Sequence, residues 1–120
     1  MRIFKNTWFR RFARDQKITD HALRDAVRRA ESGQIDANLG GGVVKQRVAR
    51  SGRGKSKGFR TVILYRAGER AIFVYGFPKS ERENIRKDEK KQFKKMAGYV
   101  IELSEEQLNE LVTMGKFEEI

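Results

Sequence analysis

Hydrophobic and polar residues alternate most clearly between Val43 and Ala49, and this alternation predicts a strand. Successive side chains of a strand point to opposite faces. Two valines and a glutamine therefore share one face, while Lys45 and Arg47 project together from the other. The strand is expected to carry two cations on one side.

Two further runs of aromatic and branched side chains, residues 59–66 and 71–77, predict a hairpin. Residues 67–68, Ala-Gly, are typical of a tight turn between them. Both runs are apolar at alternate and intervening positions, so we expect central strands covered on at least part of both faces. Arg60 lies at the start of the first run.

The N-terminal pattern predicts a strand followed by two helices. Residues 2–5 alternate and stop at Asn6-Thr7, either of which can cap a helix that carries aromatic residues at helical spacing. A second helix is expected from a cap at Thr19 or Asp20 to about Ser32. The only histidine, in its first turn, has no partner at metal-ligand spacing and is interpreted as structural or exposed.

After the hairpin, Ser80 and Glu83 have the spacing of a capping box and predict a helix from Glu81 toward Met96. Residues 99–103 are expected to form a short edge strand. Ser104 begins a last helix, with a glutamine at its capping-box position. Residues 35–42, before the cationic strand, are interpreted as a turn-rich connection because they contain three successive glycines.

The order of these elements predicts an α+β fold with a mostly antiparallel sheet, two N-terminal helices packed on one face, and C-terminal helices. A length of 120 residues suits one domain, so we expect residues 1–120 to form a single domain. Residues 98–120 are interpreted as its acidic C-terminal addition.

Charge changes this picture, because the net charge of +11 is unevenly spread. Residues 43–70 hold nine cations and one acid, whereas residues 100–120 hold six acids and one cation. Cations at such density repel one another unless an anion neutralises them. A solvated basic surface is the plain alternative, but two aligned strand cations beside a basic loop favour binding to a phosphate polymer. The candidate binding residues of this glycine-loosened loop are Arg50, Arg53, Lys55 and Lys57.

Other classes of function find little support. The chain has no cysteine, which removes disulfides, thiolate nucleophiles and cysteine-based metal sites. No stretch has the length and hydrophobicity of a membrane span or the apolar core of a secretory signal, so we expect a cytoplasmic protein without a membrane partner. Gly54-Lys55-Ser56 is not a P-loop, because Ala49 stands where a glycine is needed and a strand follows. We expect no metal and no cofactor.

Three blocks in order, LGGGVVKQR, GKSKGFRTVILYR and FVYGFPKSERENI, resemble the RelE/HigB group of toxins in the RelE/ParE superfamily of toxin-antitoxin modules. The resemblance spans about residues 33–85 and implies the same α+β fold. It implies a toxin that inhibits translation as an mRNA interferase, an endoribonuclease associated with the ribosome. It also implies a cognate antitoxin, often one with a helix-turn-helix domain.

Cleavage of RNA by its own 2′-hydroxyl needs a base, an acid and cations for the charge growing on phosphorus. Paired carboxylates are absent from the basic segment, so lysine and arginine would carry a metal-independent reaction. Crowding by like charges makes a lysine a better base, which makes Lys45 the best candidate. Arg47 and Arg60 are assigned to phosphate stabilisation.

The resemblance implies the same three residues and adds a cation just after the last strand, which is Lys79 or Arg82. That cation would serve the leaving group or contact the RNA backbone. Some family members have a base-stacking tyrosine in the last helix, where this chain has Ile85. Tyr75, Phe77 or Tyr99 would have to substitute for it, or the activity is altered.

Two alternative functions remain at this level. ParE-like gyrase poisons share the fold and lack the catalytic cations, so fold alone does not decide the function. A non-catalytic RNA-binding protein would use the basic face only to hold a phosphate backbone, with salt-sensitive binding and no cleavage products.

Overall fold

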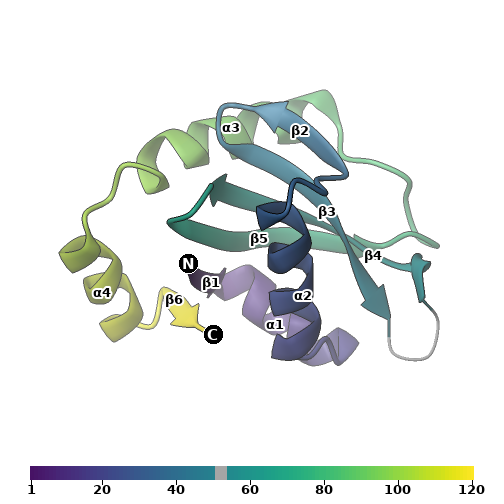
Figure 1. The fold of residues 1–120 in the computed structure, drawn as a ribbon, viewed down its shortest axis with the longest axis horizontal. Coiled ribbons are helices and arrows are strands. Elements are labelled where there is room, and N and C mark those ends of the chain that lie inside the picture. Colours follow the sequence, from purple (N-terminus) through teal and green to yellow (C-terminus); the bar gives the residue numbers. More distant parts are fainter. Residues whose placement is uncertain (51–53) are drawn as a thin grey trace.

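The computed structural model describes residues 1–50 and 54–120, apart from the side chains of residues 54–57, and within them it shows an α+β fold (Figure 1). The described elements are β1 (Arg2–Asn6), α1 (Thr7–Gln16), α2 (Asp20–Glu31), β2 (Ala37–Gly40), β3 (Val43–Arg50), β4 (Gly54–Arg66), β5 (Arg70–Pro78), α3 (Lys87–Val100), α4 (Glu105–Thr113) and β6 (Phe117–Glu119). The six described strands form one sheet in the order β2-β3-β4-β5-β1-β6. Neighbouring strands are antiparallel except β1 and β5, which are parallel.

The two N-terminal helices pack on one face of the sheet, as predicted. Phe9 of α1 and Leu23 of α2 are fully buried against Val48, Phe59 and Phe73 of the strands. Both helices begin at side-chain caps, since Asn6 Oδ1 accepts from Phe9 N–H (2.8 Å) and the Thr19 hydroxyl accepts from the amide of residue 22 (3.1 Å). Local sequence signals were therefore sufficient for this layer.

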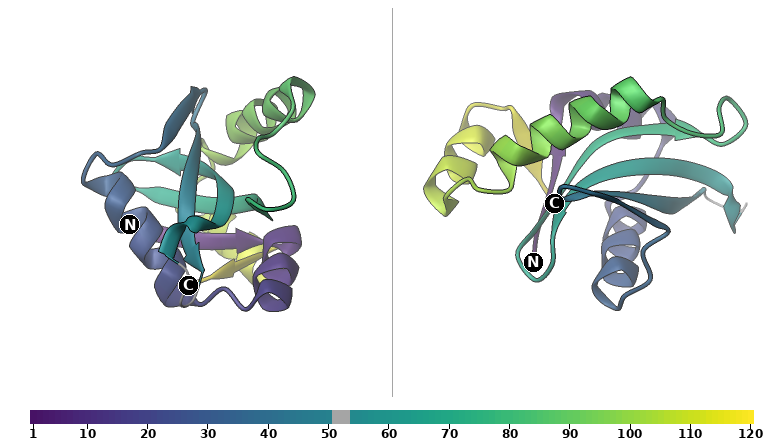
Figure 2. Two further views of the ribbon diagram at one scale, coloured as in Figure 1. Left: turned by 90° about the vertical axis from the view of Figure 1, so that its right-hand side faces the viewer. Right: turned by 90° about the horizontal axis from the view of Figure 1, so that it is seen from above.

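Helices α3 and α4 cover the other face, which confirms that the central strands are buried on both sides (Figure 2). Phe93 and Ala97 of α3 and Leu108 of α4 belong to one buried cluster with Val62 and Leu64 of β4. The C-terminal part of α3 lies against the turn between β2 and β3, because a Cβ added at Gly42 would meet side chains at 97 and 101. The opposite end of the β3–β4 face is left more open.

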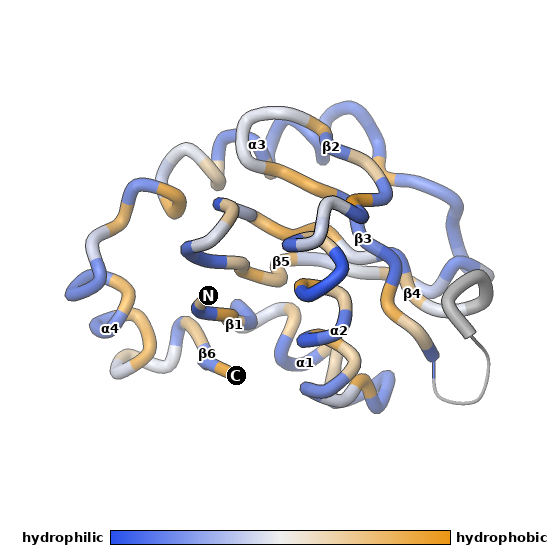
Figure 3. The backbone as a smooth tube through the Cα atoms, viewed as in Figure 1, coloured by the Kyte–Doolittle hydropathy of each residue, from blue (hydrophilic) through white to orange (hydrophobic). Residues whose placement is uncertain are grey.

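The predicted helix from Glu81 is wrong in its start, because α3 begins at Lys87 and the Ser80–Glu83 capping box is not formed. Residues 79–86 instead form a mostly hydrophilic connection (Figure 3). Arg82 in this connection donates to Tyr75 and pairs with Glu89 of α3, so contacts to other elements replace the local capping signal. The true N-terminus is held by a bond from the Arg86 amide to Glu89 Oε1 (2.8 Å).

Residues 99–103 do not form the predicted edge strand. Residues 99 and 100 complete α3, and the Ile101 amide still donates to Ala97 O (2.9 Å). The turn that follows is fastened by buried Arg70, whose Nη1 donates to Leu103 O (2.6 Å). The last helix does begin at Ser104, whose side chain and that of Gln107 each accept from the other residue's amide.

Two further strands were not predicted. Residues 37–40 form β2, which turns back into β3 through Gly40, Gly41 and Gly42, all at positive φ. The acidic C-terminal segment forms β6 on β1, where Glu119 pairs with Arg2 (2.8 Å) and Glu118 with Lys5 (3.1 Å). This segment therefore neutralises cations at the far edge of the sheet rather than those of β3. None of the described helices is long and apolar enough to cross a membrane.

Candidate functional site

Three of the five candidate catalytic residues meet on one face of the sheet. Lys45 and Arg47 lie opposite the fully buried Gln46 side chain, as the alternation predicted, and Arg47 is the direct cross-strand neighbour of Arg60. All three line an open cavity of about 240 Å³, together with Asp36. The hairpin pairing of β3 with β4 thus brings together cations that are up to 15 positions apart in the sequence.

Arg60 supplies the strongest electrostatic feature of this cavity. Its Nη1 atom is buried and has no hydrogen-bond acceptor among the described residues. A buried charged donor left without an acceptor is costly, and native proteins rarely keep one without reason. An anionic oxygen bound in the cavity that Arg47 and Arg60 line would offset the charge of both guanidinium groups.

Arg47 is held by a carboxylate that sequence reasoning missed. Asp36, just before β2, accepts from the Arg47 amide (2.6 Å) and from its Nε (3.1 Å). Burial favours the neutral acid and is the largest single influence on the pKa of Asp36, but the hydrogen bonds and charge of Arg47 together outweigh it. The pKa of Asp36 therefore lies below its ordinary value.

Lys45 is positioned by a second residue that the sequence did not single out. Its Nζ donates to Asn84 Oδ1 (2.8 Å), from the connection between β5 and α3. The same oxygen accepts from the Ile85 amide (2.9 Å). The amide oxygen of Asn84 thus holds the ammonium group near the cavity while leaving its other protons free.

Lys79 and Arg82 do not line the cavity of the strand cations. Lys79 is exposed just after β5, and its backbone amide donates to Gly58 O (3.3 Å). Arg82 is committed to protein contacts, since Nη1 donates to the Tyr75 hydroxyl (2.9 Å) and the guanidinium pairs with Glu89. The hydrogen bond from Arg82 lowers the pKa of Glu89, so this pair stays charged well into the acidic range.

The predicted basic loop is wrong in its extent, because Arg50 ends β3 and β4 already begins at Gly54. Its candidate residues are placed only in part. Arg50 lies over the Phe59 ring (5.5 Å from its centroid) and lines a larger cavity of about 570 Å³ beside the turn between α1 and α2. His21 also lines this second cavity and is exposed, in line with a non-catalytic residue. Arg53 and the side chains of Lys55 and Lys57 lie outside the described residues.

The replacement for the family's helix tyrosine is constrained by the structure. Ile85 lies in the connection before α3 rather than in a helix, and Phe77 is buried. Tyr99 is 70% exposed but belongs to the last turn of α3. Tyr75 faces the same side of the sheet as the cations, in register with Val62 of β4. Arg82 lies over the rings of both Tyr75 and Phe77, but of the three aromatic candidates only Tyr75 offers it a hydroxyl acceptor.

An α+β chain whose sheet exposes clustered cations at an open cavity has the architecture expected of a protein that binds phosphate groups. The family model described as the RelE toxin of the RelE/RelB toxin-antitoxin system matches residues 1–120. The chain therefore belongs to the RelE toxin family, and this membership implies a cognate antitoxin as its partner. No curated protein matches the chain.

Proposed function

We propose that this toxin is an mRNA interferase, a metal-independent endoribonuclease that cleaves mRNA at the ribosome and so inhibits translation. The observation that carries the proposal is the meeting of Lys45, Arg47 and Arg60 at one open cavity. Such a site fits an RNA phosphate and the extra negative charge of a pentavalent transition state. Membership of the RelE family supports the same activity.

In the proposed reaction the 2′-hydroxyl attacks the adjacent phosphorus, and the 5′-oxygen of the next nucleotide leaves. Lys45 is proposed to act as a neutral amine that accepts the 2′-hydroxyl proton and so becomes the ammonium, with Asn84 Oδ1 accepting one N–H bond and holding Nζ in place. Arg47 and Arg60, side by side on β3 and β4, are proposed to stabilise the phosphorane oxygens. Lys79, exposed at the end of β5, is the better placed of the two remaining cations to reach a leaving group, because Arg82 is paired with Glu89.

The proposal extends to the partners. We infer that the whole chain, residues 1–120, acts as one toxin domain in the cytoplasm on mRNA held by the ribosome. The inactivating antitoxin is proposed to carry a helix-turn-helix domain and to cover the cationic cavity. Arg82, stacked on the Phe77 ring (5.1 Å), and the basic loop with Arg50 are proposed to contact the RNA backbone outside the cleavage point.

The test is primer extension on a reporter mRNA incubated with purified toxin, with and without translating ribosomes. We expect ribosome-dependent cuts that are lost in Lys45→Ala and reduced at least ~100-fold in Arg60→Ala, since removing one transition-state donor costs about that factor. Lys116→Ala is the matched control, because this exposed cation precedes β6 at the opposite edge of the sheet.

Each other outcome has a distinct meaning. Cuts without ribosomes would make the protein a free ribonuclease. No cuts in either condition would overturn the nuclease proposal. Accumulation of gyrase-cleaved DNA would then indicate a ParE-like poison, and salt-sensitive RNA binding without cleavage would indicate a non-catalytic binder.

A further inference from the structure

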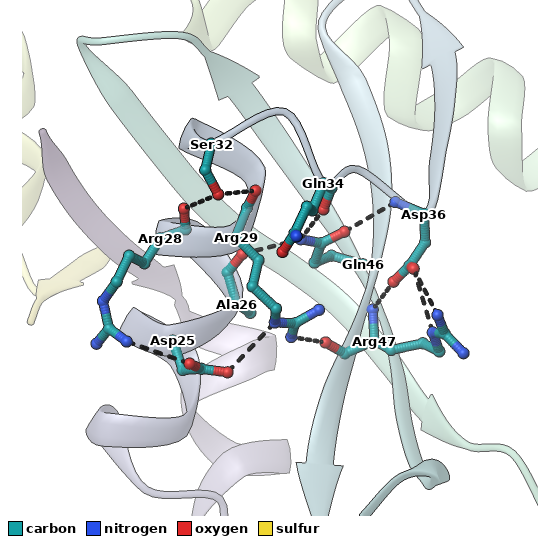
Figure 4. Close-up of polar contacts among 9 residues, drawn as sticks. All are labelled: Asp25, Ala26, Arg28, Arg29, Ser32, Gln34, Asp36, Gln46 and Arg47. Atoms are coloured by element: carbon teal, nitrogen blue, oxygen red, sulfur yellow. Dashed lines mark hydrogen bonds and ion pairs between the residues drawn. The ribbon is translucent and has the colours of Figure 1, made fainter.

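Asp36 holds Arg47 through both its backbone and its side chain (Figure 4). One carboxylate oxygen accepts from the Arg47 amide at 2.6 Å, and the other lies 3.1 Å from Nε and 3.0 Å from Nη2. Contacts to two ends of the same residue restrict rotation of the side chain between them. The direction of the guanidinium is therefore set before any ligand arrives.

The edge that Asp36 uses leaves the rest of the guanidinium available. A guanidinium has five N–H donors in a fixed plane, and Asp36 takes the edge formed by Nε and Nη2. No described residue accepts a hydrogen bond from Arg47 Nη1, and the side chain is 43% exposed. The edge formed by the two terminal nitrogens can thus bind a phosphate in bidentate fashion while Asp36 stays bound.

Asp36 is itself anchored to the buried layer under the sheet. Its amide donates to Gln46 Oε1 (3.0 Å), and Gln46 Nε2 donates to Ala26 O (2.9 Å) and Gln34 O (3.0 Å). The Gln46 side chain is fully buried, and all of its polar hydrogens and its oxygen are engaged. The backbone of Asp36 is therefore connected to α2 through the buried Gln46 side chain, which restrains the position of the carboxylate.

A second contact from α2 fixes the backbone of the same arginine. Arg29 Nη2 donates to Arg47 O, and Arg29 Nε pairs with Asp25 one turn earlier on α2 (3.2 Å). Figure 4 shows Arg29 reaching Arg47 from the helix side, while Asp36 reaches it from the opposite side. Both the main chain and the side chain of Arg47 are thus held by hydrogen bonds that lead back to one helix.

The Asp36 carboxylate also affects the repulsion between the two arginines of the cavity. Arg47 and Arg60 stand directly opposite each other on β3 and β4, and like charges in that position repel. Without a compensating anion, Arg47 would be driven away from Arg60 toward solvent. The Asp36 carboxylate offsets this repulsion and keeps both cations facing the cavity.

We propose that Asp36 is a positioning residue, which orients Arg47 so that its free edge meets the RNA phosphate beside Arg60. Asp36 is poorly suited to act as the base, because its carboxylate is paired with Arg47 and its pKa lies below the ordinary value. This inference rests on the proposed function for its substrate, and it adds a residue from outside the basic segment to the site.

The test compares Asp36→Asn and Asp36→Glu with Asp88→Asn, which alters an exposed aspartate–arginine pair on α3 and serves as the control. Single-turnover cleavage of ribosome-bound mRNA is measured across pH. We expect Asp36→Asn to lower the cleavage rate about 10- to 100-fold with little change in the half-saturating concentration, as misplacement of a catalytic group does. Partial rescue in Asp36→Glu and an unchanged shape of the pH profile are also expected.

A double-mutant cycle separates positioning from a merely structural role. If Asp36 acts through Arg47, Asp36→Asn will cause no further loss in an Arg47→Ala background. Full additivity of the two losses, or disappearance of the limb of the pH profile that reports the base, would overturn the proposal.

A readout independent of cleavage keeps the inference testable if the toxin proves not to be a nuclease. Nitrogen-15 relaxation of Arg47 Nε reports the order of the guanidinium directly. We expect Asp36→Asn to increase its mobility and Asp88→Asn to leave it unchanged. Absence of cleavage by the wild type would count against the proposed function alone, whereas unchanged Arg47 mobility in Asp36→Asn would count against the positioning role.

Discussion

Two fully buried polar residues, Gln46 and Thr61, lie under the candidate site at the same level of β3 and β4. Burying a polar group costs free energy unless it finds a partner. Gln46 meets this requirement with its three side-chain bonds, and the Thr61 hydroxyl donates to Gln46 O (2.7 Å). These hydrogen bonds restrain β3 and β4 from the buried face, and so they help to hold Lys45, Arg47 and Arg60 in place on the opposite face.

At this residue scale, Thr61→Val tests the support without touching a cation. Valine keeps the shape and removes the hydroxyl that donates to Gln46 O. We expect the free energy of unfolding to fall by about 1 kcal/mol, as for the loss of one buried hydrogen bond. Urea denaturation is the measurement, with Thr113→Val at the exposed end of α4 as the control. Equal stability of the two variants would contradict this account.

The elements that form the cavity depend on close approach of β3 and β4. Strand β4 begins at Gly54, earlier than the predicted residue 59, and its register with β3 shifts between Val48 and Arg50. A Cβ added at Gly58 would lie only 2.1 Å from Val48 O. Only glycine permits this approach, which lies two positions before Arg60 in the same strand.

Substitution of Gly58 by alanine should therefore damage the hairpin. The overlap is with backbone, which cannot move aside without separating the strands, so we expect a loss of roughly 3 kcal/mol or more. Gly98→Ala is the control, because nothing lies within 4 Å of its added Cβ in helix α3, where alanine should stabilise by up to ~1 kcal/mol. Thermal unfolding of both variants decides the matter, and a Gly58→Ala protein as stable as wild type would refute the close-approach argument.

For the whole molecule, the order of strands in the sheet places the acidic C-terminal segment away from the cations of β3. The acidic C-terminus pairs with β1, where Arg2 bonds to Glu119 and Glu105, while β3 at the other side keeps its cations exposed to ligand. The two chain termini lie close together (Figure 1), and the ion pair between Arg2 and Glu119 joins them. Charge neutralisation stabilises the β1–β6 side of the sheet, while Lys45, Arg47 and Arg60 line the open cavity on β3 and β4.

This joining of the termini predicts a dependence on pH. The hydrogen bond from Arg2 lowers the pKa of Glu119, so Glu119 stabilises the fold above its ordinary pKa, and the effect is lost as pH falls through the lowered value. The side chain is 36% exposed, which limits the effect to under about 1 kcal/mol.

The corresponding measurement is thermal unfolding of wild type and Glu119→Gln between neutral pH and about pH 3. We expect the wild type to be more stable near neutral pH and the difference to shrink as the solution becomes acidic. Glu83→Gln, at an exposed position of the connection between β5 and α3, is the control and should show no such convergence. A difference that grows on acidification would contradict the predicted sign.

The sequence by itself determined the features that depend on neighbouring residues. Alternation placed Lys45 and Arg47 on one face of β3, and the caps at Asn6, Thr19 and Ser104 marked three helix starts, because both signals act within a few residues. The hairpin of β4 and β5 was equally readable from its apolar runs and its turn.

Only the tertiary structure decided which distant groups meet the cations. Asp36 reaches Arg47 because β2 folds back on β3 through three glycines at positive φ. Strand β2 has only four residues, which is too few for an alternating pattern to predict it. Asn84 reaches Lys45 because contacts of Arg82 delay the start of α3. Hydrogen bonds between residues 11 and 39 positions apart leave no local pattern, so the sequence supplied the cations and the fold supplied the groups that orient them.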